Sequence, residues 1–219
     1  MMRSERPIRV TLFDYGAGNL HSLAKALTGP STEVRIESDP RVASDERDTD
    51  LLVLPGVGAF ASAVERLAPG REVMRDALRA GLPAVGICLG MQLLFEESDE
   101  GPGAGLGILA GRVTRLRAER VPQIGWNAVQ AEGGDQGPFD SAPLQMAYYA
   151  NSFVCRPEDD QCVLAWSEHD GDRFPAAVRA GPFGNVIGVQ FHPEKSSADG
   201  VRFLRACVAE VLGRREARR

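Results

Sequence analysis

The stretch Pro83-Ala84-Val85-Gly86-Ile87-Cys88-Leu89-Gly90-Met91-Gln92-Leu93-Leu94-Phe95 joins an apolar run, a glycine-flanked cysteine and a helical pattern. Residues 83–87 predict a buried strand, and residues 91–95 predict the helix that follows it. A nucleophile between two such elements, with a glycine two residues away on each side, is the G-x-nucleophile-x-G elbow, here with cysteine in the serine position. The glycines are needed because the backbone at the elbow is strained and neighbouring segments approach it closely.

Cys88 is therefore a candidate nucleophile. A helix that begins beside it would offer unpaired backbone N–H groups to the sulfur, which favours the thiolate. The alternative is a buried cysteine that acts as a small apolar side chain, the commoner role of a single cysteine. The flanking Gly86 and Gly90 favour the nucleophile.

The same alternation of strand and helix extends outward from the elbow in both directions. In the N-terminal half, residues 8–13 and 51–54 predict buried strands, and residues 20–27, 59–67 and 72–80 have helical spacing. From Gly111 onward strand follows strand, and the predicted strands lie around Val113, Ile124, Tyr148, Val163 and Ala177 and over residues 186–191. A last helix carries Val201, Leu204, Val208 and Leu212 on one face. The pattern predicts a three-layer α/β fold: a mostly parallel central sheet with helices on both faces, and an antiparallel extension in the C-terminal half.

Composition restricts the classes of function. The length of 219 residues suits a single domain over residues 1–219, and the net charge of −5 gives no reason to expect nucleic acid or an anionic membrane as a partner. The sequence has no long apolar run of a membrane span and no secretory signal, so we expect a cytoplasmic protein. The other cysteines, Cys155, Cys162 and Cys207, form no CxxC pair, which argues against a zinc site, and a reducing compartment argues against disulfides.

The turn 14–19, Asp14-Tyr15-Gly16-Ala17-Gly18-Asn19, follows the first predicted strand. It has neither the third glycine nor the Lys-Ser/Thr pair of phosphate-binding loops. We therefore interpret it as a tight strand-to-helix turn that binds no cofactor.

A second chemical element, Phe191-His192-Pro193-Glu194, ends the predicted strand 186–191. In an extended segment residues two apart point the same way, so Glu194 could hold one ring nitrogen of His192 and leave the other for the nucleophile. The alternative is a structural histidine beside a solvated acid. The other histidines, His21 and His169, fall in polar patterns typical of the surface.

The loop Pro55-Gly56-Val57-Gly58 is the third element, again at a strand end. A glycine-bracketed loop can turn a backbone N–H toward a developing oxyanion, and Leu89 N–H, directly after the nucleophile, would be the second donor. Without the other two elements, an ordinary glycine turn is the better interpretation of this loop.

Together, residues 55–60, 86–95 and 188–196 resemble the class I glutamine amidotransferases. Three further features resemble one branch, the glutaminase subunits of imidazole glycerol phosphate synthases: residues 14–20, the Pro-Gly-Val-Gly-Ala-Phe form of residues 55–60, and Ile124-Gly125-Trp126-Asn127. The resemblance covers nearly the whole chain and implies a flavodoxin-like fold with a Cys88, His192 and Glu194 triad. It also implies that glutamine is held by Gly58, Gln92 and the backbone of Ser152 and Phe153, with no cofactor or metal.

The resemblance further implies a heterodimer in histidine biosynthesis. Ammonia from glutamine would pass to a cyclase subunit with a (β/α)8 barrel, which makes imidazole glycerol phosphate and an aminoimidazole carboxamide ribotide. Asn19, Trp126 and Lys195 are the residues expected at the interface, and the isolated subunit is expected to have little activity until the cyclase binds its own substrate. Two positions depart from the branch, since Gln123 and Asn151 stand where it usually has histidine.

Two other functions fit parts of the pattern. A silent regulatory relative would keep the fold without chemistry, but it would have no need of Cys88, His192 and Glu194 together. A cysteine hydrolase of γ-glutamyl peptides would use the same triad and would need an open groove for the peptide.

Overall fold

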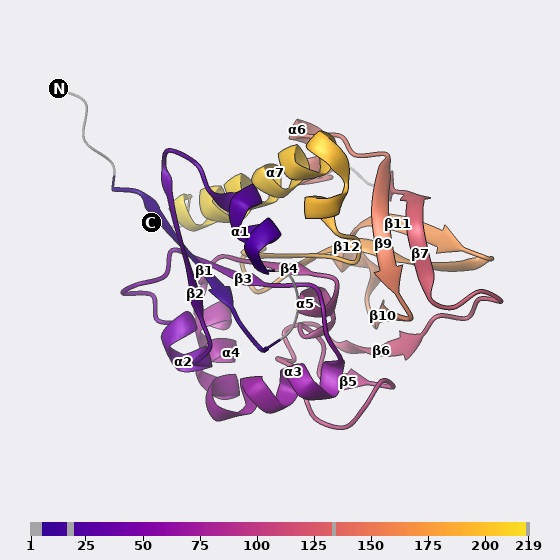
Figure 1. The fold of residues 1–219 in the computed structure, drawn as a ribbon, viewed down its shortest axis with the longest axis horizontal. Helices are drawn as coiled ribbons and strands as arrows, with labels where there is room; N and C mark the ends of the chain where they lie inside the picture. The colour runs from indigo at the N-terminus through magenta and orange to yellow at the C-terminus, as the bar shows by residue number, and fades with distance from the viewer. Residues whose placement is uncertain (1–5, 17–19, 133–134, 218–219) are drawn as a thin grey trace.

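The computed structural model describes residues 6–16, 20–132 and 135–217 of the chain. Its centre is a sheet with the strand order β2-β1-β3-β4-β13-β12-β11-β8. The strands from β2 to β13 in this order pair in parallel, and β12, β11 and β8 extend the sheet by antiparallel pairing (Figure 1). Their bounds are β1 (Ile8–Phe13), β2 (Thr32–Glu37), β3 (Leu51–Leu54), β4 (Ala84–Ile87), β8 (Gln130–Ala131), β11 (Val163–His169), β12 (Asp172–Ala180) and β13 (Val186–Val189).

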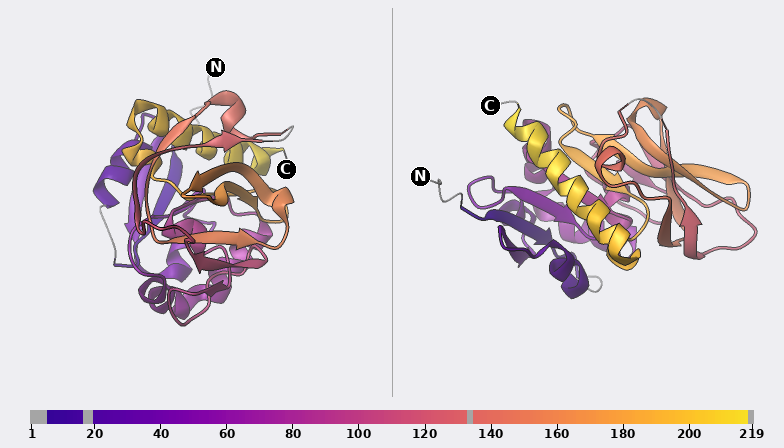
Figure 2. Two further views of the ribbon diagram at one scale, coloured as in Figure 1. Left: turned by 90° about the vertical axis from the view of Figure 1, so that its right-hand side faces the viewer. Right: turned by 90° about the horizontal axis from the view of Figure 1, so that it is seen from above.

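Helices cover both faces of this sheet (Figures 1 and 2). Helices α1 (Leu20–Leu27) and α7 (Ser197–Glu216) lie on one face, while α2 (Pro40–Ala43), α3 (Phe60–Leu67) and α4 (Arg71–Ala80) lie on the other. Side chains of β3 alternate between the two layers: Leu51 and Val53 pack under α1 and α7, and Leu52 and Leu54 pack under α3 and α4. The predicted three-layer α/β class is therefore confirmed.

The antiparallel part of the fold continues from β13 through β12 and includes two further small sheets. It contains a three-stranded sheet of β5 (Glu97–Ser98), β6 (Gly111–Arg115) and β10 (Phe153–Pro157), and a ribbon of β7 (Gln123–Ala128) and β9 (Met146–Asn151). The remaining elements are the short helix α6 (Pro138–Ser141) and the 3-10 turns η1 (Ala68–Gly70), η2 (Asp160–Cys162) and η3 (Pro193–Lys195). Figure 2 shows this part of the chain standing apart from the parallel half, with α7 lying across the sheet.

The sequence patterns missed two longer strands, β2 and β10. Strand β2 alternates Glu33, Arg35 and Glu37 with Val34 and Ile36, and lies at the edge of the sheet where no continuous apolar run is required. Strand β10 directly follows β9 with only Ser152 between them, so no turn signal separates the two strands.

Two predicted helices differ in detail from those observed. Helix α5 comprises only Leu89–Gln92, because the chain turns after Gln92 and does not continue the helix to Phe95. In α7 the fully buried stripe runs through Phe203, Leu204, Cys207 and Val211, whereas the expected Val201, Val208 and Leu212 are only half-buried. The predicted face was thus displaced by about one residue, with Leu204 common to both.

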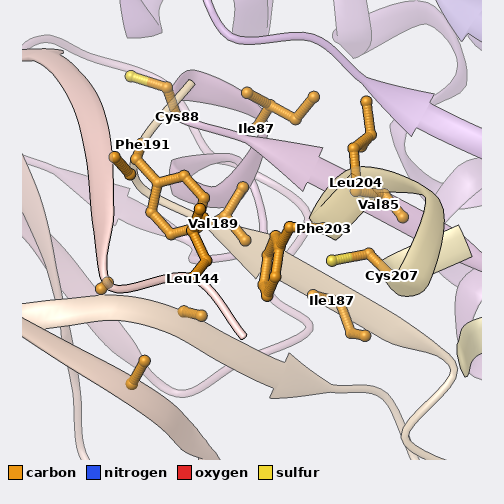
Figure 3. Close-up of a cluster of buried hydrophobic side chains, with 14 of the residues drawn as sticks. Val85, Ile87, Cys88, Leu144, Ile187, Val189, Phe191, Phe203, Leu204 and Cys207 are labelled. Atoms are coloured by element: carbon orange, nitrogen blue, oxygen red, sulfur yellow. The ribbon is translucent and has the colours of Figure 1, made fainter. Parts of the chain in front are cut away.

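One buried cluster connects the core to the end of β4. Figure 3 shows Ile87, Val189 and Phe191 lying between Cys88 and the α7 side chains Phe203 and Leu204. The backbone that carries Cys88 is therefore supported by packed side chains on one side. Among the described residues, no helix combines the length and apolar character that crossing a bilayer requires.

An ion-pair cluster at the opposite edge of the sheet joins β1 to β3. Asp50 accepts hydrogen bonds from the side chains of Arg6 and Arg9, at 2.7–3.1 Å for the shorter contacts, and from the backbone N–H of Arg9 at 3.0 Å. Burial raises the pKa of the Asp50 carboxyl, but these hydrogen bonds outweigh burial and hold the pKa well below its ordinary value. Ionised Asp50 therefore stabilises the fold at neutral pH.

We expect Asp50→Asn to lower the free energy of unfolding by ~2 kcal/mol at pH 7, as for lost hydrogen bonds to a charged group. Since the folded-state pKa is depressed, the difference should persist above the ordinary aspartate pKa of about 3.9 and shrink as the pH falls below it. Urea titrations at pH 7, 5 and 3 measure this difference. Asp48→Asn is the matched control, because its exposed carboxylate contacts Arg9 only at 3.5 Å. A difference from wild type that stays constant down to pH 3 would contradict the assigned role.

Candidate active site

Three neighbouring strands end at one edge of the sheet, and each carries one of the expected chemical elements. Strand β3 leads into Pro55-Gly56-Val57-Gly58, β4 leads into Cys88, and β13 leads toward His192. Because these strands are adjacent and parallel, their carboxyl ends lie side by side. The register of the sheet thus brings together residues that are more than a hundred positions apart.

Cys88 has a strained backbone. Its φ is +47° and its ψ is −103°, which a non-glycine residue rarely adopts, and its N–H donates to the carbonyl of Val189 at 2.7 Å. The carbonyl of Cys88 accepts from Gln92 N–H at 3.0 Å and so begins α5. The thiol is 6% exposed. The elbow predicted from the sequence is therefore present, although its helix is a single turn whose dipole is correspondingly small.

Gly90 fixes the distance between α5 and β3. A Cβ at this position would lie 2.0 Å from the carbonyl oxygen of Leu54, a separation that no side chain can occupy. The glycine therefore permits the helix to pack directly on the strand backbone, and this contact sets the position of Cys88.

His192 is 1% exposed, and hydrogen bonds of both its backbone and its ring hold it in place. Its N–H donates to Tyr148 O at 2.8 Å, its carbonyl accepts from the Ser196 hydroxyl at 2.7 Å, and its Nδ1 lies 2.9 Å from Glu194 Oε1. The histidine and the carboxylate meet as predicted, but by a different geometry. Residues 193–195 form the turn η3, closed by Lys195 N–H on His192 O at 3.0 Å, and not the extended segment expected from strand alternation.

The electrostatics of His192 favour a charged ring. Burial by itself lowers the pKa of His192, but hydrogen bonds to Cys88 and Glu194, together with their negative charges, outweigh burial and raise the pKa to about 9. At neutral pH the ring is therefore an imidazolium beside Cys88.

A cavity of about 340 Å³ opens in front of Cys88 and His192. It brings together all six residues expected to bind substrate or to form the oxyanion hole. Its lining comprises Gly56, Val57, Gly58, Cys88, Leu89, Gln92, Glu100, Ala150, Asn151, Ser152, Phe153 and His192.

Hydrogen bonds order one wall of this cavity. Gln92 Nε2 donates to Phe153 O at 3.1 Å, and Asn151 Nδ2 donates to the same oxygen at 3.2 Å. The carbonyl of Ser152 accepts from Leu116 N–H at 2.9 Å. Asn151, which stands where the branch usually has histidine, thus supports the carbonyl of Phe153 directly.

The residues of both expected oxyanion donors, Leu89 and the Val57-Gly58 loop, line the cavity. Leu89 is the first residue of α5, where a backbone N–H has no acceptor within the helix. Gly58 has a φ of +127°, which is accessible to glycine and strained for other residues, so the loop can present its N–H groups in orientations that another residue would resist. This pairing remains a prediction.

Two residues of the site were not singled out from the sequence. Glu100 reaches the cavity from the loop after β5 and accepts from Phe60 N–H at 3.1 Å. Gln190, wholly buried, donates from Nε2 to Cys88 Sγ at 3.4 Å. A polar side chain in the apolar run 186–191 was the available signal for Gln190, whereas Glu100 lies among other acidic loop residues and had none.

Two of the residues expected at the partner surface, Trp126 and Lys195, lie outside the cavity. Trp126 is 53% exposed on the β7–β9 ribbon, and Lys195 is exposed on η3 next to Glu194. Asn19 lies outside the described residues. Of the remaining histidines, His21 is exposed on α1, whereas His169 is half-buried and its Nε2 lies 2.9 Å from Arg120 O. Within the described parts of the chain, no group of His, Cys, Asp and Glu side chains is arranged to hold a metal ion.

The sequence matches the family of glutamine amidotransferases class-I over residues 11–211. It is 41% identical over 208 residues to the imidazole glycerol phosphate synthase subunit HisH of Halobacterium salinarum, covering 92% of this chain and 93% of that protein. It is 40% identical over 205 residues to the subunit of the same name from Pyrococcus furiosus, covering 90% of this chain and 96% of that protein.

Solved structures share the fold at lower identity. PurLQS of Thermotoga maritima superposes with a TM-score of 0.69 at 22% identity, over 94% of this chain and 99% of that chain. A glutamine amidotransferase from Thermotoga maritima superposes with a TM-score of 0.61 at 18% identity, over 96% of this chain and 86% of that chain.

The charge on His192 predicts how Cys88 reacts with iodoacetamide. An ordinary thiol with a pKa of about 8.5 is only about 3% thiolate at pH 7, so removing the imidazolium by His192→Asn should slow alkylation of Cys88 at pH 7 about tenfold. The ring loses its charge as the pH rises through about 9, so the two proteins should react at similar rates at pH 10. Mass spectrometry of the Cys88 peptide measures the rates. Equal rates at pH 7 would show that the imidazolium does not activate the thiol.

Proposed function

The chain belongs to the class-I glutamine amidotransferases, and from this premise we propose that it is the glutaminase subunit of an imidazole glycerol phosphate synthase. Relatives with that name align with at least nine-tenths of the chain at 40–41% identity. The observation that carries the chemistry is the contact of a strained Cys88 with a buried His192 that Glu194 holds at 2.9 Å. A cysteine nucleophile and an imidazolium at the wall of one cavity suit attack on an amide carbon.

We assign the first half of the reaction as follows. Sγ of Cys88 attacks Cδ of the glutamine side chain, and the electron pair of the C=O bond moves to oxygen, where the N–H groups of Leu89 and the Val57-Gly58 loop stabilise the oxyanion. His192 donates its proton to the amide nitrogen, the C–N bond breaks, and ammonia leaves. A γ-glutamyl thioester remains on Cys88.

The second half restores the enzyme. His192, now neutral, takes a proton from water, and the hydroxide attacks the thioester carbon. The C–S bond breaks, glutamate leaves, and Cys88 returns as the thiolate beside the imidazolium. Glu194 keeps Nδ1 bonded throughout, so that the other ring nitrogen faces the reacting atoms.

Substrate recognition follows from the polar groups of the cavity. Glutamine presents an α-ammonium and an α-carboxylate, and Glu100 is the carboxylate available in the cavity to attract the ammonium. Gln92, held by its Nε2 on Phe153 O, has its carbonyl oxygen left to accept a hydrogen bond from the substrate. Gly58 and the backbone of Ser152 and Phe153 complete the assigned binding site.

The partner surface is the outer face of the β7–β9 ribbon. Ile124, Trp126 and Met146 are 67%, 53% and 46% exposed, and Trp126 packs edge-on against Tyr148 at 6.4 Å between ring centroids. The register pairs Trp126 with Tyr148, so these side chains share one face. A contiguous exposed apolar face with an aromatic pair is typical of a protein interface. We assign it, with Lys195 and Asn19, to the cyclase barrel that receives the ammonia.

Backbone hydrogen bonds connect strand β9 of this surface to the active site. Tyr148 accepts from His192 N–H through its carbonyl, and its own N–H donates to Ser196 Oγ at 2.9 Å. A displacement of β9 on docking would therefore move the backbone of His192, and η3 with it. This connection supports activation of the subunit by its partner.

We further propose a cytoplasmic enzyme in which residues 1–219 form one amidotransferase domain. A reducing compartment keeps a nucleophilic thiol usable, and Cys88 is free. The competing γ-glutamyl peptide hydrolase would cleave γ-glutamyl dipeptides faster than glutamine, and a silent relative would cleave neither.

The test of the nucleophile is Cys88→Ala. Removal of one small group should leave the fold intact, and the glutamine-dependent synthase reaction of the complex should fall to background. Synthesis from added ammonium salts should persist, because the cyclase needs only the ammonia. Product absorbance with each nitrogen source measures both reactions. Glutamine-dependent turnover by the variant would refute the assignment of Cys88.

The test of the partner surface is Trp126→Ala. Loss of a central aromatic anchor should weaken binding to the cyclase by roughly thirtyfold, the size of a hot-spot residue. Glutaminase stimulation should weaken in parallel, while alkylation of Cys88 in the isolated subunit stays as in wild type. Val73→Ala is the matched control, since Val73 is a similarly exposed apolar residue, 50% accessible, on α4. Unchanged cyclase affinity in Trp126→Ala would place the interface elsewhere.

A further inference from the structure

A chain of hydrogen bonds links the sulfur of Cys88 to the side-chain amides of Gln190 and Gln92 and to the backbone carbonyl of Phe153. Gln190 Nε2 donates to Cys88 Sγ at 3.4 Å, and Gln190 Oε1 accepts from Gln92 Nε2 at 3.5 Å. Gln92 Nε2 also donates to the backbone carbonyl of Phe153 at 3.1 Å. Gln190 has no exposed surface and Gln92 is 4% exposed, so water does not compete for these bonds.

The position of Gln190 follows from strand alternation. Its neighbours Val189 and Phe191 face the cluster under α7, so Gln190 points to the opposite face, toward α5. Its backbone N–H donates to Ala176 O at 2.8 Å. Both the backbone and the side chain of Gln190 are thus fixed within the core.

The donor and acceptor ends of each side-chain amide determine how the next amide is oriented. Sulfur as thiolate can only accept, so Gln190 presents its NH₂ group to Cys88 and its carbonyl oxygen to Gln92. Gln92 must then donate to Gln190, and it does so with the NH₂ group that also bonds to Phe153. Gln92 Oε1 remains as an acceptor for the substrate.

We propose that Gln190 is a positioning residue that holds Cys88 as an oriented thiolate and fixes the amide of Gln92 in the orientation that accepts glutamine. The proposal rests on the proposed glutaminase function and adds to it a residue that positions both the nucleophile Cys88 and the substrate-binding Gln92. Its N–H group stabilises the negative charge on Sγ before attack. When the S–C bond forms, this charge moves to the substrate oxygen and the N–H loses its charged acceptor.

A purely structural role makes a different prediction. If Gln190 only fills the core, its replacement by an apolar residue of similar length would change stability and leave the reactivity of Cys88 against pH unaltered. The pH profile of alkylation therefore separates the two roles.

The decisive variants are Gln190→Met, which removes donor and acceptor at similar length, and Gln190→Glu, which replaces the donor by an acceptor. The half-maximal point of Cys88 alkylation by iodoacetamide should move to higher pH by about one unit in Gln190→Met, as for a lost hydrogen bond to a charged group. It should move further in Gln190→Glu. The rate at the high-pH plateau should be equal to or above that of wild type, because a less stabilised thiolate is more nucleophilic.

The complex with the cyclase gives the second readout. In Gln190→Met the KM for glutamine should rise about tenfold, because the Gln92 amide loses one of the two acceptors that orient it, and Gln92→Met should raise the KM to a similar extent. The double variant should be little worse than either single variant, since both remove the same interaction with substrate.

Asn185→Leu is the matched control. Asn185 is also a buried amide beside β13, 1% exposed, and donates to the carbonyls of Leu78 and Leu82 at 2.9 and 2.8 Å, remote from Cys88. It should lower thermal stability without moving the alkylation profile. An unmoved profile in both folded Gln190 variants would overturn the proposal. Alkylation needs no glutamine turnover, so failure of the wild-type complex to hydrolyse glutamine would instead refute the proposed function.

Discussion

The buried charge of His192 is the constraint on which the rest of the site depends. An imidazolium that is 1% exposed is costly unless it is bonded on both sides, and Cys88 and Glu194 supply the two partners. Each partner is in turn fixed by backbone that cannot move freely: Cys88 by its strained elbow and Glu194 by the turn η3. Protein groups thus replace water as the hydrogen-bond partners of the charged His192 ring, and this requirement holds Cys88 beside it.

The fold meets this constraint by backbone contacts at strand ends. Gly90 packs on the carbonyl of Leu54, Cys88 N–H bonds to Val189 O, and His192 N–H bonds to Tyr148 O. These contacts join β3, β4, β13 and β9, so every chemical group is held by a strand from a different part of the sequence. Small displacements of any one strand change the distance between nucleophile and histidine, so the proposed docking of a partner on β9 would alter the rate.

Local patterns were sufficient to predict most of the parallel half of the fold and the elements that carry Cys88, His192 and Glu194. Short apolar runs marked β1, β3 and β4, and the glycines around Cys88 marked the elbow. Features that depend on tertiary pairing could not be predicted in this way. Strand β2 is stabilised by pairing with β1. The helix after Cys88 has only one turn because the chain turns after Gln92. Glu100 and Gln190 are further examples, since only the folded chain places a loop carboxylate and a strand amide beside the nucleophile.

The β7–β9 ribbon connects the cavity to an exposed apolar surface. Side chains of a strand alternate between faces, and the pairs Gln123 with Asn151 and Trp126 with Tyr148 fall on opposite faces of the ribbon. The inner pair is buried, and Asn151 reaches the substrate cavity and holds Phe153 O, whereas the outer face exposes Trp126. A shift in register by one residue would exchange the faces and disrupt both the cavity wall and the exposed apolar face. Under the proposed function, partner and substrate would be separated by the thickness of one ribbon, so docking energy would reach the substrate site without a long path through the protein.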